Sequence, residues 1–98
     1  MSETTFFEIT LLAAESTFGG RDEIEDPLDD ALKQAGIGEV TGGGSGMGIA
    51  NIDVEVTDPE RGLALIREVL RNLGVAPSTI IRQSGSPYIE HSVYEPSA

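Results

Sequence analysis

Apolar and polar side chains alternate with the period of a β-strand in several stretches of this chain. The alternation predicts strands at residues 5–14, 49–57 and 88–94. Two shorter stretches, 37–41 and 79–83, are rich in β-branched residues and predict two more strands. The pattern at 49–57 is the most regular, so one face of that strand is predicted to be buried and the other exposed.

Between these strands, two segments repeat apolar residues with the period of an α-helix. Both predicted helices open on an aspartate followed by a proline, Asp26-Pro27 and Asp58-Pro59, which is typical of an N-cap and a first helical position. Both end on a glycine, Gly36 or Gly74, where a left-handed residue is expected. The apolar stripes are Leu28, Ala31, Leu32 and Ala35 in the first helix and Leu63, Ile66, Leu70 and Leu73 in the second.

The resulting order, β-α-β-β-α-β, is that of the ferredoxin-like split β-α-β motif. We therefore predict one α+β domain over residues 1–98, a sandwich of two helices on one face of an antiparallel sheet. Strands one and three are expected at the centre of the sheet, and the alternation at 88–94 allows an extra C-terminal strand. Residues 1–4 and 95–98 are predicted to be flexible tails.

The charge of the chain narrows the range of its partners. Seventeen acidic residues against six basic ones give a net charge of −11. Nucleic acids and anionic membranes require a basic face, so neither is an expected partner. A basic protein is electrostatically favoured, although a net charge of this size also serves plain solubility.

Cysteine content and apolar run length bear on the compartment. The chain has no cysteine, which excludes disulfides and thiolate metal sites and fits a reducing compartment. No apolar run is long enough to span a bilayer, and the first residues lack the positive charge of a secretory signal. We therefore expect a cytoplasmic protein.

The alternation also predicts a polar sheet face opposite the helices. Glu8, Asn51, Asp53 and Glu55 are expected there on neighbouring strands, close enough for their carboxylates to repel one another. This face is the candidate partner-binding site, and oxygen ligands would also suit a weak divalent-cation site. The alternative is that Arg82 or the C-terminal strand covers the face and neutralises it.

A glycine-rich run, residues 42–48, joins two predicted strands. Phosphate-binding glycine loops lead into a helix instead, and this run lacks the Lys-Ser/Thr of a P-loop. We interpret it as a mobile hairpin loop, with a ligand-contacting flap as the functional alternative. The candidate ligand-loop residues are Gly42, Gly43, Gly44, Ser45 and Gly46.

The remaining polar residues give little support for catalysis. His91 is the single histidine and lies beside Ile89 and Val93 by strand period, which favours a half-buried structural role. No nucleophile motif or histidine-rich metal site is present, so we predict no catalytic residue, no metal and no cofactor. The acidic stretch at 15–30 is interpreted as a solvated loop or a second acidic contact patch.

Two stretches carry a family resemblance. Residues 38–56, with the glycine run, and residues 62–77 resemble small uncharacterised bacterial proteins of ferredoxin-like design. Residues 58–63, Asp-Pro-Glu-Arg-Gly-Leu, are similar to part of the amino-acid-binding ACT regulatory domain. The glycine-rich excursion between strands two and three is similar in position to the long loop of PII signalling proteins. The latter resemblances imply a regulatory domain that binds a small molecule.

These observations lead to two functional hypotheses. The first is a non-enzymatic acidic module that binds a basic protein partner, for example an immunity-type inhibitor of a nuclease toxin. The alternative is a small-molecule-binding regulatory domain, ACT- or PII-like, with the glycine-rich run as its lid. Because an open sheet has edges that can pair with another chain, a homodimer is also predicted.

Overall fold

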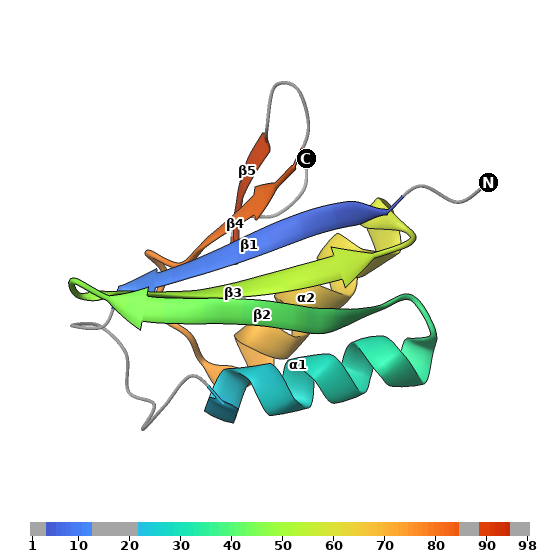
Figure 1. The fold of residues 1–98 in the computed structure, drawn as a ribbon, viewed down its shortest axis with the longest axis horizontal. Coiled ribbons are helices and arrows are strands. Elements are labelled where there is room, and N and C mark those ends of the chain that lie inside the picture. Colours follow the sequence, from blue (N-terminus) through green and yellow to red (C-terminus); the bar gives the residue numbers. More distant parts are fainter. Residues whose placement is uncertain (1–3, 13–21, 85–88, 95–98) are drawn as a thin grey trace.

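The structure is a computed structural model, and it describes residues 4–12, 22–84 and 89–94. The described chain forms five strands and two helices in the order β-α-β-β-α-β-β, which is the predicted order with the extra C-terminal strand (Figure 1). The ends predicted to be tails lie outside the described residues, except for Thr4. The elements are β1 (Thr5–Leu12), α1 (Asp22–Ala35), β2 (Gly38–Gly46), β3 (Ile49–Val56), α2 (Pro59–Leu73), β4 (Ile80–Gln83) and β5 (Ile89–Ser92).

The strands form one antiparallel sheet in the order β2-β3-β1-β4-β5. Strand β3 lies between β1 and β2, and β1 lies between β3 and β4, so both β-α-β units are split. The predicted α+β class and central strands are therefore confirmed. The complete order differs from that of a four-stranded ferredoxin sheet because β5 forms an additional edge.

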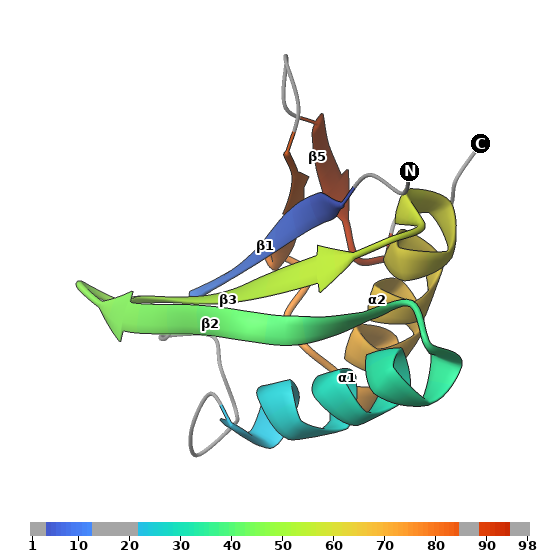
Figure 2. The same ribbon diagram turned by 45° about the vertical axis from the view of Figure 1, so that its right-hand side comes forward.

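Both helices lie on the same side of the sheet, and the core fills the space between the layers (Figure 2). The strand alternation assigns the faces correctly, because Phe7 and Ile9 of β1 and Val54 of β3 are buried. Burial of each such side chain contributes about 1.5–3 kcal/mol relative to exposure. The buried core consists of Phe7, Ile9, Leu11, Ile24, Leu28, Leu32, Ile37, Ile52, Val54, Val56, Ile66, Leu70, Val75, Ile81 and Val93.

The predicted boundaries of α2 are both right, whereas for α1 the end at Gly36, with a φ of 69°, is right and the start is wrong. In α2 the Asp58 side chain caps the helix by accepting from the Arg61 amide, and Gly74 ends it with a φ of 74°. Helix α1 begins at Asp22, so Pro27 lies inside it and not at its first position. The extra turn places Ile24 in the core one turn before Leu28, whereas Ala35 of the predicted stripe is exposed.

The glycine-rich run is a strand and not the predicted loop. Residues 42–46 belong to β2 and pair with β3, from Gly42 opposite Asp53 to Gly46 opposite Ile49. The hairpin turns at Met47 and Gly48, which both have positive φ, as a two-residue turn between right-twisted strands requires. The register shifts between Val40 and Gly42, so Thr41 forms a bulge.

The C-terminal strand is held by helix α2. Arg67 and Arg71 donate from Nε to the carbonyls of Ser92 and Val93, at 2.9 and 2.7 Å. The sequence suggests only a favourable charge at the helix C-terminus for these arginines. Their contacts show a second structural role, which is to attach β5 and the residues after it to the helix layer.

Neither helix among the described residues has the length and apolar character needed to cross a bilayer.

Candidate functional site

The sheet face opposite the helices carries most of the candidate residues. Cross-strand partners lie on the same face, so the register orders these side chains in rows. One row runs from Asp53 on β3 through Glu8 on β1 to Arg82 on β4 and Glu90 on β5. The next row contains Glu39, Glu55 and Phe6, and a third contains Asn51 and Thr10. The alternation thus places the predicted acidic residues on one face.

Arg82 neutralises only part of this face. Its guanidinium lies 3.6 Å from Glu8 and 3.0 Å from Glu90, so it bridges β1 and β5. The three side chains are between 41% and 47% exposed, so this network is screened by solvent and its contribution to stability is small. The predicted neutralisation by Arg82 therefore applies to Glu8 but does not extend to β3.

Three carboxylates remain on this face, which we call the acidic patch: Glu39, Asp53 and Glu55. Within the described residues none of these three carboxylates forms an ion pair. Lys33 lies near Glu39, and the charge of Glu39 contributes to the raised pKa of Lys33. Glu39 and Glu55 are directly opposite each other, and so are Asp53 and Glu8. Like charges in directly opposite positions destabilise a sheet, so the patch is a local electrostatic cost.

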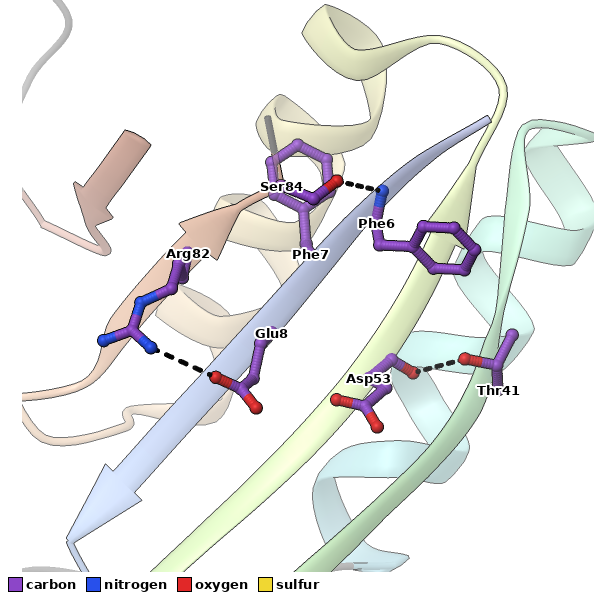
Figure 3. Close-up of a pocket in the computed structure, with 7 residues that line it drawn as sticks. All are labelled: Phe6, Phe7, Glu8, Thr41, Asp53, Arg82 and Ser84. Carbon is purple, nitrogen blue, oxygen red and sulfur yellow. Dashed lines mark hydrogen bonds and ion pairs between the residues drawn. The ribbon is translucent and has the colours of Figure 1, made fainter. Parts of the chain in front are cut away.

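A hollow of about 500 Å³ lies beside the acidic patch (Figure 3). The ring of Phe6 leans from β1 toward β3 and is 49% exposed, whereas the neighbouring Phe7 turns into the core. The backbone amide of Phe6 donates to the Ser84 hydroxyl at 3.1 Å, which fixes this end of β1 to β4. The hollow is lined by Phe6, Phe7, Glu8, Thr41, Asp53, Arg82 and Ser84.

The bulge in β2 shapes the rim of this hollow. Thr41 is the extra residue, and its hydroxyl donates to the carbonyl of Asp53 at 3.4 Å. After the bulge, Gly42 of β2 lies beside the Asp53 carboxylate. A Cβ atom at Gly42 would lie 3.8 Å from Asp53 Oδ2, which is an ordinary van der Waals distance. Gly42 therefore places no side chain over the Asp53 carboxylate.

The structure brings some of the predicted site residues together and separates others. Glu8, Asp53 and the Phe6 ring share the hollow, Glu55 lies in the adjacent row, and Asn51 lies one row away beside Gly44. The predicted ligand-loop residues, 42–46, form the strand at the edge of this face. Sequence reasoning missed Phe6, although its place in the polar phase of β1 was a usable signal, and the bulge at Thr41 had none.

Asp29 of α1 covers the first part of the β2 edge. Its carboxylate accepts from the Val40 amide at 2.9 Å and pairs with Lys33, also at 2.9 Å. The hydrogen bond from Lys33 and then the one from Val40 hold the pKa of Asp29 below its ordinary value. The carboxylate therefore stays ionised and ties the helix to the strand.

His91 lies on the helix side of β5, away from the acidic patch. Its Nε2 is 2.9 Å from Gln83 Oε1, and its ring centroid is 6.5 Å from that of Phe7. Burial, and then the charge of Arg67, lower the pKa of His91 below its ordinary value. The imidazole is half-buried and packs against Phe7, as the strand period predicts.

The second acidic region is helical where the structure describes it. Of the stretch 15–30, residues 15–21 lie outside the described residues and 22–30 belong to α1. The first turn of α1 carries Asp22, Glu23 and Glu25, which favour the positive end of the helix dipole. This explanation is sufficient for them without a ligand.

Over residues 4–12, 22–84 and 89–94, no group of three or more His, Asp or Glu side chains is arranged to hold a metal ion. Comparison with protein-family models, with curated proteins and with solved structures found no match to this chain.

Proposed function

We propose that this domain is a non-enzymatic interaction module that binds a basic protein partner through the acidic patch. One observation carries the proposal: Glu39, Asp53 and Glu55 share one face and have no ion-pair partner among the described residues. Repulsion within the patch is relieved when a cation binds, so the free protein is favourably charged for a basic surface.

The hollow adds a second element of recognition. A guanidinium or ammonium group that enters it on the β3 side, away from Arg82, would meet the Asp53 carboxylate and the exposed Phe6 ring together (Figure 3). A cation above an aromatic face gains about 0.5–1 kcal/mol at an exposed site. Arginine combines this contact with bidentate hydrogen bonding to a carboxylate, so an arginine-bearing partner is favoured over one with lysine alone.

The proposal also covers the fold family of the domain and one specific kind of partner. We interpret the domain as a ferredoxin-like unit extended by β5, because β2, β3, β1 and β4 follow the split β-α-β arrangement. An immunity-type inhibitor that covers the cationic site of a nuclease toxin would use such an acidic face. The net charge of −11 would accelerate its association with a basic partner.

The test uses a short, fluorescein-labelled peptide in which arginine alternates with serine. The double variant D53N/E55Q removes two charges from the acidic patch and keeps its shape. The matched control D30N/E68Q makes the same two changes at exposed positions of the helix layer. We expect the patch variant to weaken binding by about ten-fold, from two lost charge pairs of up to about 1 kcal/mol each.

Equal weakening by both double variants would contradict the proposal, because only the net charge would then matter.

The small-molecule alternative is tested by a thermal-shift screen of amino acids and nucleotides. A ligand at about 100 times its dissociation constant stabilises the fold by about 2.7 kcal/mol. A stabilising metabolite whose effect disappears in Asp53→Asn would reassign the hollow to that function.

A further inference from the structure

Within the described residues, the outer edge of β2 is bonded before the bulge and unpaired after it. Before the bulge, the Val40 amide is occupied by the Asp29 carboxylate. From Thr41 to Gly46, the described part of the chain places no strand or side-chain donor outside β2, which pairs only with β3. An unpaired strand edge offers its main-chain groups to an extended segment of another chain.

The described contacts do not require glycine at two positions in this half of β2, Gly42 and Gly44. Elsewhere the requirement is visible: a Cβ atom on Gly38 would lie 2.3 Å from the Glu55 carbonyl oxygen, and Gly48 has a φ of 79°. At Gly42 and Gly44 the same test finds only ordinary contacts, at 3.8 and 3.6 Å, and no positive φ. Glycine weakens a strand interior, so these two residues have a cost that the fold leaves unexplained.

The contacts at these two glycines show what their absent side chains leave open. The atom nearest to a Cβ on Gly42 would be Asp53 Oδ2, and the atom nearest to one on Gly44 would be Asn51 Oδ1. A strand added outside β2 would lie about 10 Å from β3, two strand spacings away. Two arginine or lysine side chains at alternate positions of that strand could pass over Gly42 and Gly44, one to each of these oxygen atoms.

We propose that the Thr41–Gly46 edge of β2 binds an extended basic segment of the partner as an additional strand. Alternate arginine or lysine side chains of that segment pass over Gly42 and Gly44 to Asp53 and Asn51. This inference rests on the proposed function and adds the binding mode. Charge complementarity selects this occupant, since a second copy of the chain would bring its own acidic patch to the interface.

The experiment compares two labelled peptides of equal charge. In the first, arginine alternates with valine, which favours an extended strand. In the second, the valines are replaced by proline, which removes the main-chain donors that a strand ladder needs. We expect the valine peptide to bind about ten-fold more tightly, and to slow hydrogen exchange at the amides of residues 42–46.

Two protein variants locate the effect. G42T/G44T adds side chains where the space allows them, so the fold is retained while the path to Asp53 and Asn51 is filled. We expect this variant to lose the preference for the valine peptide. D53N/E55Q should weaken both peptides, and D30N/E68Q should weaken them less.

Three outcomes would overturn the inference. If both peptides bind equally and only D53N/E55Q weakens them, the acidic patch binds cations without strand addition, and the proposed function survives. If D53N/E55Q has no more effect than D30N/E68Q, the proposed function fails as well. A dimer in light scattering that G42T/G44T converts to a monomer would assign the edge to a second copy.

Discussion

The two edges of the sheet are covered in opposite ways. The β5 edge is attached to α2 by two arginine hydrogen bonds to main-chain carbonyls, and Tyr94 donates from its hydroxyl to the Val75 carbonyl. The β2 edge has one such contact among the described residues, from the Val40 amide to Asp29. Bonded main chain is protected against pairing, so α2 protects the C-terminal end of β5, whereas within the described residues β2 is bonded only before its bulge and is open to a partner after it.

The β5 and β2 edges differ because the side chains available to bond their main chains differ in length. Arginine can span from a helix to the strand at the sheet edge and donate to its carbonyls, whereas the glycines of β2 have nothing to offer a neighbouring helix. The hairpin formed by β2 and β3 also extends past the helix layer at its turn (Figure 1). The arginines of α2 therefore hold the C-terminal end of β5, and within the described residues β2 is accessible after its bulge.

The largest expected effect comes from detaching the β5 edge. Arg71→Met keeps the aliphatic stem and removes the donor to Val93, so it should cost about 1.5–3 kcal/mol of unfolding free energy. Denaturant unfolding measures the loss, and Arg61→Met on the exposed side of the same helix is the control. A loss no larger than that of the control would show that α2 does not hold β5.

The glycines of β2 sharpen the comparison within a single strand. Gly38→Ala should cost about 1–3 kcal/mol, because its Cβ would overlap the Glu55 carbonyl. Gly42→Thr and Gly44→Thr should instead stabilise by up to about 1 kcal/mol each, since threonine favours strands. Thermal unfolding of the three variants tests this, and a destabilised Gly42→Thr would mean that the fold needs glycine there.

A smaller effect concerns charge on the open face. D53N/E55Q relieves the repulsion of Asp53 with Glu8 and of Glu55 with Glu39, so it should stabilise the free protein by up to about 1 kcal/mol at low salt. The gain should shrink in about 1 M salt, where the Debye length is about 3 Å. A destabilised double variant would show that these carboxylates have stabilising contacts.

The smallest effect is the pH dependence contributed by His91 near the β5 edge. Its pKa is lowered in the fold, so the unfolded chain binds the proton first as the pH falls through about 6.5. The stabilising contribution is complete above that pH and is lost as the pH falls toward the folded pKa. Unfolding free energies at pH 7.5 and 5.5 should differ more for the native protein than for His91→Gln; equal differences would contradict the shift.

The sequence predicts the local features of this fold better than the contacts between distant segments. The Asp58-Pro59 cap and the strand alternation are local signals, and both are confirmed. The start of α1 was misplaced because burial of Ile24 extends the helix beyond its proline signal. The composition of the glycine run predicts a loop, because composition alone does not show that β3 lies beside it.

In the candidate site, too, the local features can be predicted from the sequence better than the contacts between distant segments. Alternation alone places Asp53 and Glu55 on the face opposite the helices, because a strand has a period of two. The pairing of Arg82 with Glu8 and Glu90, and its distance from the patch on β3, depend on strand register. Register arises from contacts between segments far apart in the chain, and a single sequence does not contain it directly.

A map of where a basic probe binds tests whether the acidic patch is the binding surface. Backbone amide shifts are recorded by NMR as the arginine–serine peptide is added at constant ionic strength. The account predicts the largest changes at Phe6, Thr41, Asp53 and Glu55, and small ones along α1. Changes that are largest in the acidic first turn of α1, or that spread evenly over the surface, would contradict it.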